Sequence, residues 1–489
     1  MRLIAYMKPY AHWVIFALLL VLGLTAFDLY RPMLVGDAID TFGANGDYDV
    51  IIATAIKYAV VLALSFAFNI AQTWILQKTG QNIILQMRKD LYRHIQSLGS
   101  RYFDITPVGK LVTRVTNDVE ALNEMYSGIL VQLFRNIVKI VGLAGVMLVL
   151  DVRLAAISFV LMPLVIGLTV LCQKIARNIY RLYRTRLTDI NTFLSEHLSG
   201  MKIIQIFGRQ ERKFEEFHDK NTKLYKAFYR EMLMYAVFRP LIYILSILSL
   251  MIVLWFGSRN VFDEIISVGT LYIFSNYIRS FFDPIQELAE QFSTLQSSIA
   301  SAEKIFTVMD EDEFIPEVEN PKQPDKITGK IEFDHVWFAY DGENYVLKDV
   351  SFVINPGEKV AFVGATGAGK SSILNLIGRY YDIQKGHIYI DGIDIRQLSK
   401  KKLRSAIGQM QQDVFIFEGD VAYNIRLNDD AITDAQVKAA AEYVNASHFI
   451  EKLPQGYHEP VTERGATFSA GERQLLSFAR TLEIGRAHV

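Results

Sequence analysis

Two features of this 489-residue chain predict an all-α transmembrane domain of six helices with long cytoplasmic extensions, followed by a partial α/β P-loop domain. The first is a series of long apolar segments before residue 290. The second is the string G-A-T-G-A-G-K-S at residues 364–371, which fits the pattern G-x-x-x-x-G-K-[ST]. Acidic and proline-rich sequence from residue 310 marks a boundary. The predicted parts are therefore a transmembrane domain at 1–309, a linker at 310–330 and a P-loop domain at 331–482.

The composition excludes several classes of site. Lys and Arg number 51 and Asp and Glu 52, so no global field attracts nucleic acid. Cys172 is the only cysteine, which excludes an internal disulfide and a cysteine-based zinc site. No small-residue cleavage pattern follows the first apolar run, so we expect a retained span there.

Six segments are long and apolar enough to cross a bilayer, which takes about 20 residues per helix. They lie at residues 13–34, 58–77, 128–150, 154–173, 235–258 and 265–282. Residues 36–50 carry four aspartates and no Lys or Arg, whereas 78–114 and 174–230 are rich in both. Because basic residues mark cytoplasmic segments, we expect 36–50 outside and the other two segments inside, with the N-terminus and the C-terminal half also cytoplasmic.

The two inside segments have apolar residues at helical spacing over 81–98 and 178–226, which predicts helices reaching tens of Å beyond the bilayer. Ionisable groups also lie within or beside the spans. Such groups usually face the helix bundle or a water-filled cavity, and snorkelling to the interface is the alternative. These groups are Asp28, Arg135, Lys139, Arg239 and Arg279.

The glycine-rich string has the flanks that a phosphate site requires. Residues 359–363 predict a buried strand and 371–377 the start of a helix, whose positive end attracts anions. We expect Lys370 to reach the β- and γ-phosphates of ATP and the Ser371 hydroxyl to ligate Mg²⁺. The predicted ATP-binding loop comprises Gly364, Ala365, Thr366, Gly367, Ala368, Gly369, Lys370, Ser371 and Ser372.

A second string, F-S-A-G-E-R-Q at residues 468–474, follows about a hundred residues later. With the phosphate loop and the six spans, it resembles the ATP-binding cassette (ABC) exporters of the half-transporter type, over about residues 10–482. The string is similar to the family signature, usually written L-S-G-G-Q, with Ala470 in place of a glycine and Glu472 in place of the glutamine. The resemblance implies that Ser469, Ala470, Gly471 and Glu472 meet ATP held by a partner's phosphate loop.

Three further positions match the family pattern. Residues 336–340 resemble the stretch whose aromatic ring stacks on adenine, which implies that role for Tyr340; a core residue at a strand end is the alternative. Gln412 matches the glutamine that touches Mg²⁺ and the attacking water; a surface amide is the alternative. Glu463 matches the loop that meets the membrane hairpins; an ordinary exposed carboxylate is the alternative.

Segments of the membrane half also resemble the family. Residues 103–118 are similar to its first coupling segment, and residues 196–207 to its second. The alternative for Asp104 and Asp118 is a helix-capping or turn role, and both roles are compatible.

The acidic strand and the later histidine that the family uses for hydrolysis cannot be assigned. No catalytic residue is therefore predicted, and the resemblance implies C-terminal truncation after Leu482. Residues 483–489 lack strand character, so we expect an artefactual tail in which Glu483 and His488 have no catalytic role. The chain as written is expected to show no ATP turnover.

The resemblance implies ATP-driven export of a hydrophobic or amphipathic small molecule, lipid or peptide across the cell membrane, by a dimer with a second half-transporter and without nucleic acid. The alternatives are a degenerate-site subunit of a heterodimer that acts mainly as an ATP-binding partner, and an ATP-gated channel. A soluble repair-type ATPase is excluded by the six spans. The sequence names neither the cargo nor the choice between homodimer and heterodimer.

Overall fold

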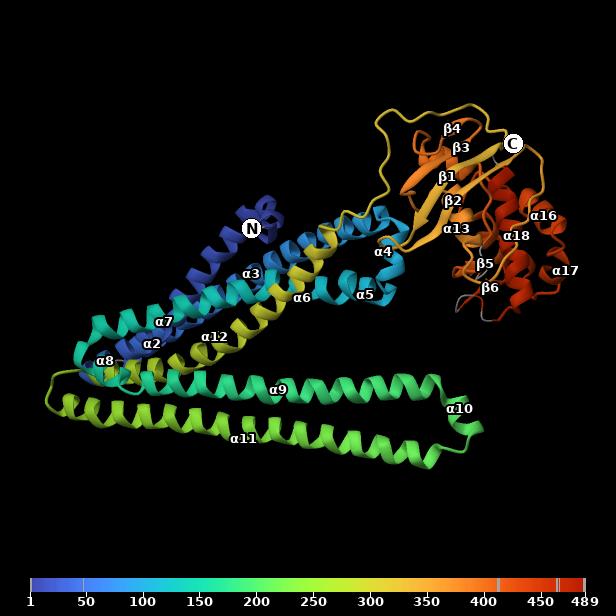
Figure 1. Cartoon of the computed structure of the whole chain (residues 1–489). Helices are drawn as coiled ribbons and strands as arrows, with labels where there is room; N and C mark the ends of the chain where they lie inside the picture. The colour runs from blue at the N-terminus through green and yellow to red at the C-terminus, as the bar shows by residue number, and fades with distance from the viewer. Residues whose placement is uncertain (1, 47, 411–413, 463–464, 466, 487–489) are drawn as a thin grey trace. The chain divides into compact units, whose positions relative to one another are not determined.

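The computed structural model describes residues 2–46, 48–410, 414–462, 465 and 467–486, and the chain forms two compact units (Figure 1). One unit comprises Met1–Ile95 and Gly109–Asp310, and the other comprises Gln96–Val108 and Glu311–Val489. The short segment Gln96–Val108 therefore packs with the second unit, although helices of the first unit precede and follow it. Each unit is considered by itself.

Helices are the only regular secondary structure in the described residues of the first unit (Figure 1). Its helices are α1 (Arg2–Met7), η1 (Lys8–Tyr10), α2 (Ala11–Asn45), α3 (Tyr48–Ser97), α5 (Val108–Thr113), α6 (Val119–Glu124), α7 (Leu130–Leu150), α8 (Val152–Phe159), α9 (Met162–Ser199), α10 (Met201–Ile206), α11 (Gln210–Phe262) and α12 (Val268–Met309). Two π-helical turns, η2 (Arg114–Asp118) and η3 (Met125–Ile129), join α5, α6 and α7.

Five of these helical stretches are long and apolar enough to cross a membrane, which confirms the predicted helical transmembrane class. They are Arg2–Gly43, Tyr48–Ser97, Val108–Leu150, Val152–Ser199 and Gln210–Phe262. The sixth predicted span, 265–282, falls mostly in α12, which is not among the five found in the described residues. Asn276 and Arg279 lower the hydropathy of this part of α12.

Several helices are much longer than a bilayer requires. The 50 residues of α3 span about 75 Å, and α11 has 53 residues. Figure 1 shows α9 and α11 side by side as an antiparallel pair, with α10 closing the far end. The segment expected to be an outside loop, 36–50, is largely helical, because α2 continues to Asn45 before a left-handed Gly46 with φ of 64°.

A close approach of two backbones joins α2 to α12. The Gly269 N–H donates to Asp40 Oδ1 at 2.7 Å. A Cβ added at Gly269 would lie 2.2 Å from the Gly36 carbonyl oxygen, so only glycine fits at this crossing. Nearby, the buried Tyr277 hydroxyl of α12 donates to the Leu29 carbonyl of α2 at 2.6 Å.

The second unit contains an antiparallel sheet in the order β2-β1-β3-β4. The strands are β1 (Ile331–Ala339), β2 (Tyr345–Ile354), β3 (Lys385–Ile390) and β4 (Ile393–Asp394). Helix α13 (Lys370–Ile377) packs with the sheet, and their shared core includes Phe333, Phe338, Leu376 and Ile388. The helix predicted from residue 371 is α13, which begins one residue earlier, at Lys370.

A helical subdomain with its own core completes this unit. It contains α15 (Val421–Arg426), α16 (Asp434–Tyr443), α17 (Ser447–Ile450) and α18 (Ala470–Arg486), around buried residues such as Ile425, Val437 and Leu476. The remaining elements of the unit are α4 (Ser100–Ile105), α14 (Lys400–Ser405), η4 (Gly456–His458) and the paired short strands β5 (Gly419–Asp420) and β6 (Pro460–Val461).

The strand predicted over residues 359–363 does not form, so that prediction is wrong. This segment carries no strand hydrogen bonding, and Val363 is 91% exposed. A strand is stabilised by hydrogen-bonded ladder partners on its edges, and no described strand pairs with these residues, although Phe362 packs against Phe352 of β2. The apolar pattern of residues 359–363 is therefore not sufficient by itself to form a strand.

A buried arginine ties the linker to the sheet. Arg379 is 2% exposed, and its guanidinium donates to Asp382 Oδ1 at 2.8 Å and to the Pro316 carbonyl at 2.9 Å. It also donates to the carbonyls of Ile395 and Arg396 at 3.5 and 3.3 Å. The Arg379 side chain thus supplies hydrogen bonds to one carboxylate and three backbone carbonyls.

Replacing Arg379 with alanine should destabilise the second unit by about 3 kcal/mol, because it leaves a carboxylate and three carbonyls without their donor. Urea unfolding followed by the fluorescence of Trp337, with the other three tryptophans changed to phenylalanine, measures this. The exposed Lys401→Ala change is the matched control and should stay within about 0.5 kcal/mol. A loss below about 1 kcal/mol for Arg379→Ala would contradict the assignment.

Candidate nucleotide site

The phosphate loop depends on glycine at two described positions. Gly367 and Gly369 both have a φ of 87°, in the left-handed region that other residues seldom adopt. A Cβ at Gly369 would also lie 2.6 Å from Leu347 Cδ2. Conformation and space therefore both require glycine at residue 369.

Lys370 folds back over its own loop. Its ammonium donates to the Gly364 carbonyl at 2.9 Å and to the Ala365 carbonyl at 2.7 Å. This places a full positive charge inside the turn that residues 364–369 make. The rest of that turn, Thr366 and Ala368, is exposed.

The start of α13 is open to an anion. Its N-cap is Gly369, which has no side chain to accept from the first backbone N–H groups. Ser371 is exposed beside this end, whereas Ser372 is 5% exposed and faces inward. The free N–H groups, the helix dipole and Lys370 together favour a phosphate here.

Tyr340 lies next to this loop, immediately after β1. Its hydroxyl donates to Ser372 Oγ at 3.0 Å, so the structure brings these two predicted residues together. The half-buried ring also makes edge contacts with Phe338 and Tyr381, at centroid distances of 4.7 and 5.1 Å. Tyr340 is thus part of the strand-end packing, which was the alternative considered, and stacking on adenine stays a prediction.

Helix α4 contributes two side chains next to Tyr340 that the sequence did not single out together. The Tyr381 hydroxyl donates to Asp104 Oδ2 at 2.5 Å, and burial together with this carboxylate raises the pKa of Tyr381. Arg101 lies 3.6 Å from both Glu313 and Asp341. A cavity of about 180 Å³ is lined by Arg101, Glu313, Tyr340 and Tyr381, among others.

Asp118 has a different role from Asp104. It is buried in the first unit, paired with Arg114, and accepts a hydrogen bond from Ser301 of α12 at 3.0 Å. Of the two aspartates in the segment that resembles a coupling element, Asp104 therefore contacts Tyr381 in the second unit, and Asp118 packs against α12 in the first.

The residues resembling the signature form a helix start. The Glu472 N–H donates to Ser469 Oγ at 3.2 Å, and the Ser469 N–H donates to Glu472 Oε2 at 2.7 Å. This is a capping box, for which the S-x-x-E spacing is the sequence signal. Glu472 therefore has a structural role in the helix cap, which accounts for a glutamate where the family signature has glutamine. Ala470 and Gly471 are exposed in the first turn of α18.

Two predicted positions lie outside the described residues. Gln412 falls in 411–413 and Glu463 in 463–464. Their contacts with Mg²⁺, water or the membrane hairpins stay predictions.

Gly369→Ala should weaken ATP binding at least tenfold, because strain of about 1–3 kcal/mol and the clash with Leu347 both distort the loop. Titration with a fluorescent ATP analogue measures the affinity. Gly357→Ala is the matched control, since Gly357 has a φ of 77° with open space around it and lies outside the loop. Equal losses for the two variants would show that general strain, not loop geometry, is responsible.

Comparisons with known proteins identify the family of this chain. A family model described as "ABC transporter transmembrane region" matches residues 14–285, and one described as "ABC transporter" matches 347–486. The chain is 38% identical to Streptococcus pneumoniae exp8, named as an ABC transporter ATP-binding protein, over 98% of this chain and 82% of that protein. It is 35% identical to the fatty acid ABC transporter ATP-binding/permease protein of Mycobacterium bovis, over 86% of this chain and 67% of that protein.

The fold has a solved counterpart. The structure of a bacterial Atm1-family ABC exporter with ATP bound superposes with a TM-score of 0.77 at 22% identity, covering 97% of this chain and 84% of that one. The family models together span both units. The chain therefore belongs to the ABC transporter family, with a transmembrane region and an ATP-binding domain fused in one polypeptide, as in exporter half-transporters.

Proposed function

We propose that this protein exports a hydrophobic or amphipathic small molecule, lipid or peptide across the cell membrane, driven by ATP. The observation that supports this proposal is an uncapped helix start at α13, next to a glycine-rich turn and the Lys370 ammonium. The same chain contains helices long and apolar enough to cross a membrane. The name of the fatty acid transporter relative supports an amphipathic cargo. The N-terminus and the ATP-binding domain are cytoplasmic in this proposal.

The residues around the loop fit ATP with Mg²⁺. The N–H groups of α13 and the Lys370 ammonium hold the phosphates, and the exposed Ser371 hydroxyl holds the metal together with Gln412. Mg²⁺ neutralises phosphate charge when bound. Tyr340 holds the adenine, and its hydrogen bond to Ser372 keeps it at a fixed distance from the phosphate loop.

Two such chains act together. The capped start of α18, with Ser469 and Gly471, meets the ATP on the partner's phosphate loop. ATP binds the closed pair of domains more tightly than the open pair, so it shifts the population towards closure. Helix α4 transmits this closure, because Asp104 and Arg101 contact the residues around Tyr340.

A degenerate-site subunit is the second candidate function. Ala470 and Glu472 depart from the family signature and favour it. The capping box gives Glu472 a structural purpose, so only Ala470 remains as an unexplained departure. The exporter therefore remains our first proposal.

Lys370→Ala should weaken binding of labelled ATP at least tenfold, because it removes the charge-assisted contacts to the phosphates. Equilibrium binding to the purified chain in detergent measures this. Lys359→Ala is the matched control, since Lys359 is exposed ahead of the loop. If wild type binds no ATP, or if both variants bind as wild type does, the proposal fails.

Pairing of two chains can be tested by cysteine cross-linking. With Cys172 changed to serine, Ala365→Cys in the phosphate loop and Ala470→Cys at the start of α18 supply two exposed positions. ATP with Mg²⁺ should increase disulfide-linked dimer severalfold over nucleotide-free protein, and each single-cysteine chain should show no ATP-dependent increase. ATP-independent cross-linking would contradict closure across the dimer.

A further inference from the structure

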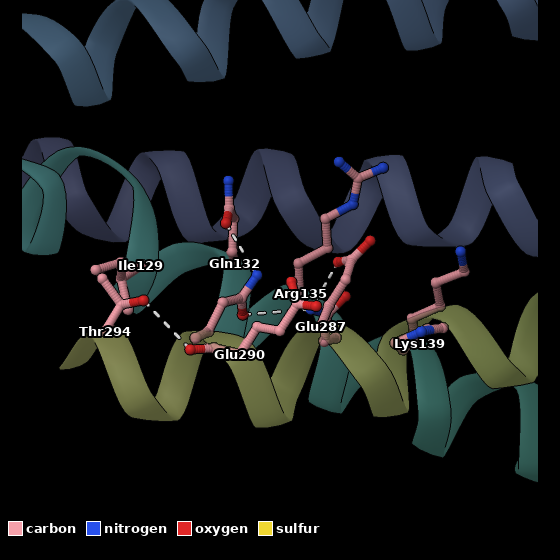
Figure 2. A pocket seen from close by; sticks show the side chains of 10 residues that line it. Ile129, Gln132, Arg135, Lys139, Glu287, Glu290 and Thr294 are labelled. Atoms are coloured by element: carbon pink, nitrogen blue, oxygen red, sulfur yellow. Dashed lines mark hydrogen bonds between the residues drawn. The ribbon is translucent and has the colours of Figure 1, made fainter. Parts of the chain in front are cut away.

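The first unit contains two cavities that meet at one lysine. The larger has a volume of about 580 Å³ and lies between α7 and α12. The other, of about 260 Å³, is lined by α2, α3, α7 and α12, and Lys139 lines both. In Figure 2 the labelled residues of the larger cavity run from Ile129 and Thr294 at one end to Lys139 at the other.

The charges that line these cavities are segregated by helix. The α2 and α7 side carries Arg31, Arg135 and Lys139 against a single acid, Asp28. Asp28 pairs with Arg31 and lies 3.3 Å from Arg135, so one carboxylate serves two guanidiniums. This side therefore has a net positive charge.

The α12 side is acidic. It lines the larger cavity with Glu287 and Glu290. Asn136, which is 4% exposed, donates to Glu287 Oε2 at 3.0 Å and so fixes the direction of that carboxylate. Among the described side chains, no cation lies within ion-pair distance of Glu287 or Glu290, and no carboxylate lies within that distance of Lys139.

Opposite charges without an ion-pair partner around one space favour a ligand that carries both charges. A charged group in a membrane domain is costly unless it is paired or hydrated, so these positions are functional candidates. A purely apolar compound would bury the lysine and the glutamates without partners. A purely anionic compound would satisfy Lys139 but be repelled by α12, because two carboxylates face it.

We propose that these cavities bind the zwitterionic head group of an amphiphile, with its anionic group at Lys139 and its ammonium at Glu287. Residues 128 and 282 are the cytoplasmic ends of their predicted spans, so the larger cavity begins near Ile129 at the inner membrane surface, where a lipid-like head group lies, and extends to Lys139 within the span. The inference deepens the proposed export function and rests on it.

Native mass spectrometry of the purified chain in detergent tests this with two probes of equal acyl length, lysophosphatidylethanolamine and lysophosphatidylglycerol. The zwitterionic probe should bind about tenfold more tightly than the anionic one. Glu287→Gln should weaken only the zwitterionic probe, about tenfold, whereas Lys139→Gln should weaken both and Lys139→Arg should restore binding.

Matched controls are Lys57→Gln and Glu303→Gln, two exposed positions of the same unit that line neither cavity. Equal binding of the two probes, or an unchanged ratio in Glu287→Gln, would overturn the assignment. ATP adducts in the same spectra separate the two proposals: ATP binding without head-group preference refutes this inference alone. If the wild-type chain shows no ATP adduct, the export proposal is refuted.

Discussion

The uncapped start of α13 is the constraint on which the ATP-binding unit depends. A helix end with unsatisfied N–H groups is costly unless an anion or a capping side chain serves it. Here Gly369 removes the possible cap and Lys370 turns back onto the loop carbonyls, so the end is held ready for an external anion. Ser372 in the first turn of α13 accepts a hydrogen bond from Tyr340, and the Tyr340 ring contacts Tyr381. Tyr381 in turn donates to Asp104.

The two units differ in how their charged side chains are paired. In the second unit, Arg379 is buried and its donors are satisfied by a carboxylate and by backbone carbonyls, which makes it structural. In the membrane unit, Lys139 and Glu287 line open space with no ion-pair partner among the described side chains. Burial with full satisfaction indicates stability, whereas an unpaired charge beside a cavity indicates a ligand.

The sequence predicted the elements that depend on local pattern. Apolar length identified five of the six predicted membrane helices, and the G-x-x-x-x-G-K-S string identified the loop leading into α13. The prediction of a strand at 359–363 was wrong because a strand also needs hydrogen-bonded partner strands, and these depend on the whole sheet. The pairing of Asp104 with Tyr381, 277 residues apart, had no sequence signal, since neither residue belongs to a periodic pattern. The capping box at Ser469 did have a sequence signal, the S-x-x-E spacing.

That capping box has a chemical consequence for the serine. A hydroxyl oxygen accepts through its lone pairs and donates through its single proton. The Glu472 N–H occupies the accepting side of Ser469, and this leaves the proton on the same oxygen to be offered elsewhere. The side chain is thereby oriented by contacts within its own helix turn. Little rotational freedom is then lost when this hydroxyl donates to a bound group, so the entropic cost of that contact is small.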